Sequence, residues 1–147
     1  MAVKFAFAKN PTTLKDKFIC WWRHGAYYHS EVILEENADG TYTIASAVPG
    51  IGVRTAYNQS LPASDWDIID GPGQPEVAAA WFKAHDGEKY DWFGLLGFVL
   101  SPIKDVSPNK WWCSNADLTS VGMSSCAWRF EPNTMYAFLS DLLKVQY

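Results

Sequence analysis

Cys113 is the residue of this sequence whose surroundings best suit covalent chemistry. It follows Trp111 and Trp112 and opens a run that can form a helix, with a stop signal at Gly122. Unpaired backbone N–H groups and the positive end of the helix dipole favour an anion at such a helix start, so the thiol should ionise more readily than that of a free cysteine. The sequence therefore predicts a nucleophile here, and an inert packing cysteine is the competing interpretation.

A thiol nucleophile needs an imidazole to take its proton, and the imidazole needs a third group that fixes its tautomer. Of the three histidines, His29 alone comes with such a group, because Glu31 follows two residues later in a run typical of a strand. Side chains two apart on a strand share a face, with Cα atoms about 6.6 Å apart. The spacing permits a triad of Cys113, His29 and Glu31. Asn115 is a competing orienting group, but two helical residues turn it about 200° from Cys113.

Other arrangements of these side chains have weaker support. A His-x-Glu pair also arises by chance on the polar face of a strand. His24 and His85 lie near the expected ends of two helices and are expected to be structural. A mixed metal site would use His24, His29, Glu31 and Cys113, but it lacks the close ligand spacing of zinc motifs, so we expect no metal and no cofactor.

Length and composition narrow the class of protein. The 147 residues fit one domain, residues 1–147, and a net charge of −4 without a basic run argues against nucleic acid as a partner. The three cysteines, Cys20, Cys113 and Cys126, form no close pair, which indicates a reducing compartment. No signal sequence is predicted, and the apolar run at residues 92–100 is far shorter than the roughly twenty residues of a membrane span. We expect a protein made in the cytoplasm, without a transmembrane segment.

The elements that must position Cys113 and His29 follow from periodicity and turn signals. Strands are expected at residues 1–8, 28–34, 41–48, 51–56 and 66–70. A capping box at residues 13–16 should begin a helix, with Leu14, Phe18, Trp21 and Trp22 at helical spacing behind it. Pro75 should begin a second helix, with Val77, Ala78, Trp81 and Phe82 on one face. The Cys113 helix follows an apolar segment at residues 93–100 and a loop at 101–108. A last helix from Pro132 should turn inward Met135, Tyr136, Leu139, Leu142 and Leu143. This order predicts an α+β fold, a mostly antiparallel sheet with helices packed on one side.

Several unlinked segments share the order found in one family of enzymes. A tryptophan-rich, basic segment leads into a Tyr-x-His-x-Glu strand within residues 19–31, and the match continues at residues 52–54, 87–98, 111–114 and 132–136. Together, these segments are spread over nearly the whole length of the chain. They resemble the circularly permuted papain-like cysteine peptidases and amidases of the NlpC superfamily, especially the YiiX-like branch and its phage-encoded members.

The resemblance implies a permuted papain-like fold, in which the histidine precedes the cysteine. It implies Cys113 as the nucleophile, His29 as the base and Glu31 as its orienting partner. The implied reaction is hydrolysis of an amide bond through an acyl-thioester, with the backbone N–H of Cys113 helping to stabilise the oxyanion. Peptide bonds of peptidoglycan are the implied substrate, while amides or esters on lipids and proteins stay open because the same triad serves all of them.

One position departs from the pattern of the family. Asn115 stands where relatives commonly carry a glutamate after Cys-Ser. A second hypothesis follows, in which the domain keeps the fold without the reaction and serves as a phage virion or assembly protein, with virion proteins or a ligand as its partners. In the catalytic interpretation, Tyr27, Tyr28 and Trp112 are expected to contact the substrate.

Overall fold

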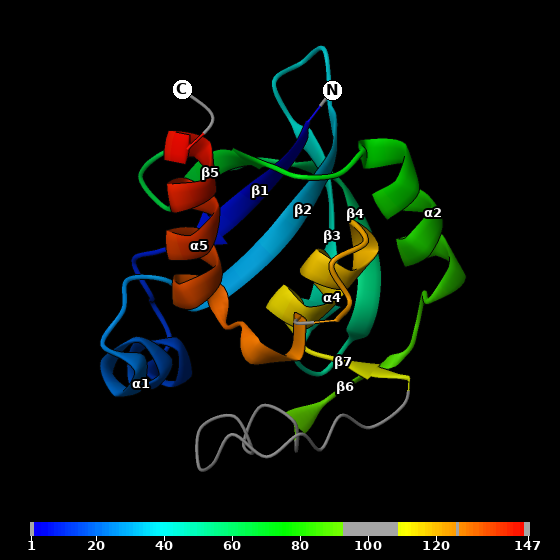
Figure 1. Cartoon of the computed structure of the whole chain (residues 1–147). Helices are drawn as coiled ribbons and strands as arrows, with labels where there is room; N and C mark the ends of the chain where they lie inside the picture. The colour runs from blue at the N-terminus through cyan, green and yellow to red at the C-terminus, as the bar shows by residue number, and fades with distance from the viewer. Residues whose placement is uncertain (1, 93–108, 126, 146–147) are drawn as a thin grey trace.

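The computed structural model describes residues 2–92, 109–125 and 127–145. Within them, five strands form an antiparallel sheet in the order β4-β3-β2-β1-β5 (Figure 1). The strands are β1 (Val3–Ala8), β2 (His29–Glu36), β3 (Tyr42–Val48), β4 (Gly52–Gln59) and β5 (Trp66–Gly71). The expected apolar segment at 93–100, the loop at 101–108 and Cys126 lie outside the described residues.

The sequence-predicted strands are found with most of their ends within two residues, because their turn signals are local, while β4 continues three residues beyond the expected end at residue 56. Gly40 and Gly50 adopt φ of +82° and +83° in the two hairpin turns, a conformation that glycine reaches without strain. The short strands β6 (Lys89–Tyr90) and β7 (Lys110–Trp111) add a separate parallel pair. β7 leads directly into the Cys113 helix.

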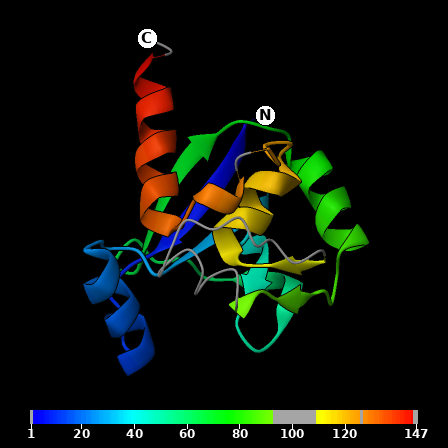
Figure 2. The ribbon, with the colours of Figure 1, turned by 60° about the horizontal axis from the view of Figure 1, so that its bottom comes forward.

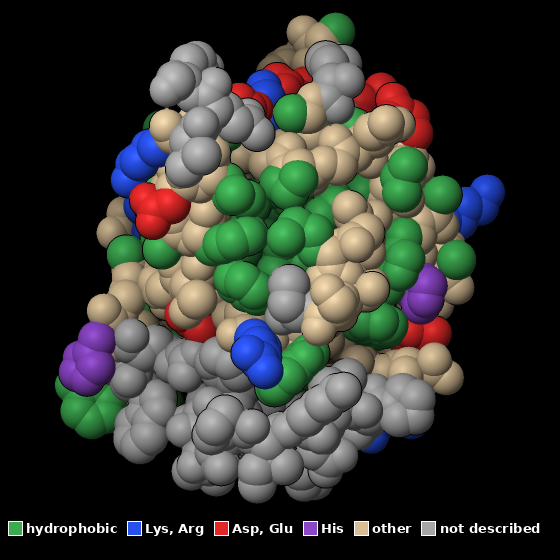
Figure 3. Space-filling model, in the orientation of Figure 1, with side chains coloured by type: hydrophobic (Ala, Val, Ile, Leu, Met, Phe, Trp, Pro, Cys, Tyr) green, Lys and Arg blue, Asp and Glu red, His purple; other side chains and the backbone are tan. Residues whose placement is uncertain are grey.

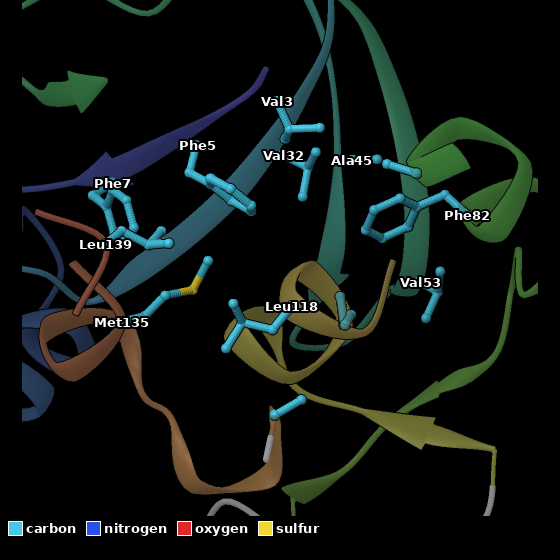
Figure 4. Close-up of a cluster of buried hydrophobic side chains, with 14 residues drawn as sticks. Val3, Phe5, Phe7, Val32, Ala45, Val53, Phe82, Leu118, Met135 and Leu139 are labelled. Atoms are coloured by element: carbon cyan, nitrogen blue, oxygen red, sulfur yellow. The ribbon is translucent and has the colours of Figure 1, made fainter. Parts of the chain in front are cut away.

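Helices α2 (Pro75–Ala84), α4 (Cys113–Ser120) and α5 (Pro132–Val145) lie over one face of the sheet, together with the short 3₁₀ helix η1 (Ala127–Arg129) (Figures 1 and 2). Between the layers lies a cluster of fully buried side chains, shown in Figure 4: Phe5, Phe7 and Val32 from the sheet, and Phe82, Leu118, Met135 and Leu139 from the helices. The α+β class expected from the sequence, with helices on one side of an antiparallel sheet, is confirmed.

A smaller apolar cluster covers the opposite face of the sheet. Ala6, Ile33 and Ile44 are buried there, and partly buried side chains that include Leu61 and Trp66 pack against them. The sheet is therefore apolar on both faces near its centre. On the helical face, hydrophobic side chains gather over the middle of the surface, with charged side chains around them (Figure 3).

Helix α1 (Leu14–Arg23) begins as predicted, since the Thr13 side chain accepts a hydrogen bond from the Asp16 N–H. His24 ends it in a left-handed conformation, with Gly25 as the next residue. Three of the apolar residues at helical spacing in α1 do not pack into the core. Leu14, Phe18 and Trp21 are 87%, 57% and 66% exposed, because α1 lies beside the lower end of the sheet rather than on its face (Figure 1).

The expectation that Leu142 turns inward is wrong, and Val77, which was expected on the apolar face of α2, is exposed as well. Val77 in α2 is 52% exposed, and Leu142 in α5 is 37% exposed. Ala78 and Phe82, and Met135 and Leu139, do face the core. The apolar stripe of each helix is therefore narrower than the hydrophobic pattern suggests, because only the residues that meet the sheet are buried.

Candidate active site

Helix α4 carries Cys113 at its first position and is buried along nearly its whole length. Trp112 forms the N-cap in an extended conformation, and Gly122, with φ of +90°, lies just beyond the C-cap. The hydrogen-bond ladder starts where the Ala116 N–H donates to the Trp112 carbonyl, so the N–H of Cys113 has no partner within the helix. The predicted placement of the sulfur at a helix N-terminus is found.

His29 and Glu31 lie at the start of β2 and point the same way, as strand alternation predicts. His29 Nε2 lies 2.8 Å from Glu31 Oε1, and the imidazole also forms a side-chain hydrogen bond with the Cys113 thiol. Because Nε2 is hydrogen-bonded to Glu31, Nδ1 is the ring nitrogen that can form the hydrogen bond with the sulfur. The structure thus brings together Cys113, His29 and Glu31. In the sequence, His29 and Glu31 precede Cys113 by 84 and 82 residues.

The lead into β2 is fixed by Asn133 at the start of α5. Its side chain accepts a hydrogen bond from the Tyr27 N–H at 2.8 Å and donates to the Tyr27 carbonyl at 2.9 Å. Its own position is held by Glu131, which accepts from the Asn133 amide and from the Thr134 N–H. The backbone two residues before His29 is therefore held at one place against α5.

Arg54 on β4 completes the site and was not assigned a chemical role from the sequence. Both of its terminal nitrogens donate to the Glu31 carboxylate, with Nη1 3.0 Å from Oε2. Arg54 reaches Glu31 across β3, where its pairing partner is Ser46, whose small side chain leaves room for it. One feature of the sequence could have pointed to Arg54, because it is the only charged residue among the eight residues of β4.

The charges of these four side chains support one another. Burial lowers the pKa of His29, but the negative charge of Glu31 and the hydrogen bond to Cys113 outweigh it and raise the pKa to about 10. Burial raises the pKa of the Cys113 thiol, yet the His29 imidazolium and the backbone N–H groups of Ser30 and Ser114 bring it below its usual value. The pKa of Glu31 is likewise lowered, against burial, by His29 and Arg54. These shifts favour a thiolate–imidazolium pair backed by a carboxylate–guanidinium pair.

Access to this pair is narrow. Cys113 is 4% exposed and Glu31 1%, whereas 16% of the His29 side chain is exposed. Tyr90 on β6 is close enough for the charge of Cys113 to raise its pKa, although burial contributes more. The sulfur is therefore nearly buried, and the imidazole is the most accessible of the three groups.

Asn115 is 3% exposed and accepts a hydrogen bond at 3.4 Å from Thr119. Among the described residues, nothing accepts a hydrogen bond from its Nδ2. At this position the chain thus buries a neutral amide close to the ion pair.

The residues expected to contact substrate lie in different surroundings. Trp112 is 3% exposed, and its indole donates to the Phe130 carbonyl. The Tyr27 hydroxyl donates to Asp67, and its ring packs on Phe7. These contacts give Trp112 and Tyr27 structural roles, and Tyr27 remains partly exposed. Tyr28 is half-buried, and burial raises its pKa.

The other histidines are structural, as expected. His24 is the exposed C-cap of α1, and the His85 ring stacks on Trp81 with centroids 4.0 Å apart. Within the described part of the chain, no group of three or more His, Cys, Asp or Glu side chains is arranged to hold a metal ion. Cys20 and Cys113 are both free thiols.

No protein-family model matches this chain, and no curated protein matches its sequence. None of the helices that the structure describes combines the length and the apolar character needed to cross a membrane.

Proposed function

We propose that this chain is a cysteine hydrolase that cleaves amide bonds by way of an acyl-thioester on Cys113. The observation that carries the proposal is the hydrogen-bonded series from the Cys113 thiol through His29 to the buried Glu31 carboxylate. A nucleophile, a base and an orienting acid in contact are the arrangement that thiol acyl transfer requires.

The first step is attack by the Cys113 thiolate on the carbonyl carbon of the substrate. A carbon–sulfur bond forms, and the electron pair of the C=O π bond moves onto the oxygen. The N–H of Cys113, which has no partner within α4, together with the positive end of the helix dipole, stabilises that oxyanion. The intermediate collapses as the carbon–nitrogen bond breaks, and the leaving amine takes the proton of the His29 imidazolium.

The second step is hydrolysis of the thioester. Acylation removes the negative charge of Cys113, which is one of the causes that raise the pKa of His29. The pKa of the imidazole then falls, so His29 can accept a proton from water as the water attacks the carbonyl. Breakage of the carbon–sulfur bond returns the thiolate, and the proton on His29 restores the ion pair. Glu31 and Arg54 hold the ring in place throughout.

The fold that we propose is the circularly permuted papain-like fold of the NlpC superfamily, YiiX-like type. A nucleophile at the start of a buried helix, packed on an antiparallel sheet whose strand carries the base, supports this assignment. The histidine-before-cysteine order supports the permuted form. Peptidoglycan peptide bonds are the first substrate class to test, in a phage-encoded setting, followed by other amides and esters.

The test is hydrolysis of a panel of substrates by the full chain and by Cys113→Ala. The panel contains peptidoglycan fragments, simple peptide amides and nitrophenyl esters. We expect turnover by the wild-type protein and loss of at least about a thousand-fold in the variant, because removal of a nucleophile eliminates the covalent route. Cys20→Ala is the matched control, since the hydrogen bond described for the Cys20 thiol goes to the Ala26 carbonyl and not to the site, and it should retain full activity.

Turnover that survives in Cys113→Ala would reject the mechanism. A wild-type thiol with the pH profile of a free cysteine, together with no turnover, would instead favour the non-catalytic virion or assembly protein. Measurement of the rate of Cys113 alkylation against pH separates these outcomes without knowledge of the substrate.

A further inference from the structure

Asp117 is a buried acid next to the site that the proposed reaction does not use. It is fully buried, and its Oδ2 accepts a hydrogen bond of 2.6 Å from the Ser30 hydroxyl. No hydrogen-bond partner for its Oδ1 is found in the described part of the chain. Asp117 follows Cys113 by four residues, so the two lie on the same face of α4, one turn apart.

Ser30 links Asp117 to both reacting groups. It follows His29 in the chain, and its backbone N–H donates to the Cys113 sulfur. Pairing between β2 and β3 begins only at Val32, which leaves the edge of β2 at Ser30 open toward α4. The Ser30–Asp117 hydrogen bond is therefore a second side-chain link, beside the His29–Cys113 hydrogen bond, between α4 and β2 at the level of the sulfur.

We propose that Asp117, as a neutral carboxylic acid, is a positioning residue that acts through Ser30 to hold the His29 imidazole and the Ser30 N–H on the Cys113 sulfur. The proposal rests on the proposed function, because its consequence is the ionisation of the nucleophile.

The neutral form follows from the surrounding charges. Those that act on Asp117 are Cys113 on its own helix and Glu31 and His29 on β2, with Arg54 paired to Glu31 behind them. A thiolate, an imidazolium, a carboxylate and a guanidinium already sum to zero. A fifth charge would be buried without a counterion and would oppose the thiolate. Burial, and then the charge of Cys113, raise the pKa of Asp117 well above its usual value.

The experiment measures the rate of iodoacetamide alkylation against pH in a background in which Cys20 and Cys126 are serine, so that Cys113 is the sole thiol. Asp117→Asn keeps a neutral side chain of the same shape with an oxygen that can accept from Ser30. Asp117→Leu has about the same size and removes the acceptor. Ser30→Ala breaks the same contact from the strand while it keeps the backbone N–H. Circular dichroism reports the fold of each variant.

We expect the alkylation midpoint of Asp117→Asn to match the background protein within about 0.3 pH units. In Asp117→Leu and Ser30→Ala it should rise by about one unit or more, which means about ten-fold less thiolate below the midpoint. The kcat/KM on any substrate that the background protein hydrolyses should follow the same order. Should Asp117→Leu fail to fold, Ser30→Ala still reports the same contact.

Two results would overturn the inference. One is a changed midpoint in Asp117→Asn, because a neutral acid should be replaceable by its amide. The other is an unchanged midpoint in both Asp117→Leu and Ser30→Ala. Either result leaves the proposed function standing if the background protein has an activated thiol. A background midpoint equal to that of a free cysteine would reject the proposed function itself.

Discussion

Replacement of Arg54 by methionine tests whether the buried carboxylate at the centre of the site depends on its guanidinium. The Glu31 side chain is 2% exposed and receives two hydrogen bonds from Arg54 and one from His29. Removal of one partner of a buried ion pair costs roughly 3–5 kcal/mol, because the other charge stays buried. His29 still faces Glu31 in the variant, so we expect the lower end of that range, about 3 kcal/mol.

Urea unfolding measures this loss. With a slope of roughly 2 kcal/mol per molar urea, a loss of about 3 kcal/mol lowers the midpoint by about 1.5 M. Lys4→Met is the matched control, since it removes one partner of the Lys4–Glu36 ion pair, whose side chains are 40% and 51% exposed. An exposed pair contributes about 0–1 kcal/mol, so the control should lower the midpoint by at most about 0.5 M.

A second substitution identifies the cause of the loss. Glu31→Gln should destabilise the wild-type protein, because it breaks contacts with both Arg54 and His29. In the Arg54→Met background the same change also removes the uncompensated charge, so its cost should shrink or reverse sign. A midpoint for Arg54→Met no lower than that of Lys4→Met would refute the reasoning, as would equal effects of Glu31→Gln in the two backgrounds.

Two further predictions concern pH. In the folded wild type, the pKa of His29 is raised to about 10 from 6.5 and that of Cys113 is lowered from 9.0, so the folded pair holds one proton between the lowered pKa of Cys113 and about pH 10, the unfolded pair holds one between pH 6.5 and 9.0, and the two ranges overlap in a window just below pH 9. The pair should then add no pH dependence to the free energy of unfolding in this window. Cys113→Ser lacks the thiolate, so above pH 6.5 unfolding releases the His29 proton and no thiolate takes it up. The free energy of unfolding of this variant should therefore decline as pH rises above 6.5. Parallel curves of unfolding free energy against pH for the variant and the wild type would contradict the ion pair. Asn115→Glu should destabilise more at pH 8 than at pH 5, because burial raises the pKa of an unpaired carboxyl at this 3% exposed position; equal losses would show that the new carboxylate finds a counterion.

The sequence by itself determined the local features of this protein. The capping box at Thr13, the proline at the first position of α2 and the helix start at Cys113 are all properties of a few neighbouring residues, and each is found where predicted. His29 and Glu31 share a face because any strand alternates its side chains. The α+β class followed from the order of such elements along the chain.

The tertiary structure alone decided which distant groups meet these residues. Arg54 reaches Glu31 because only β3 lies between β4 and β2 in the sheet. Ser46, the residue of β3 that pairs with Arg54, has a small side chain that leaves room for the guanidinium. Asp117 meets Ser30 because α4 packs on the open edge of β2. Neither contact has a periodic signal, since strand order and helix placement depend on how the whole core packs.

Burial likewise could not be inferred from the hydrophobic pattern alone. Trp21 in α1 has the spacing of a core residue yet is 66% exposed, whereas Asp117 and Glu31 are charged types that are fully buried or nearly so. An apolar stripe is buried only where another element covers it, and a carboxyl is buried only where partners or protonation offset the loss of water. The sequence supplies both apolar and acidic side chains, but the packing of α1 and α4 relative to the sheet decides which of them are buried and which are exposed.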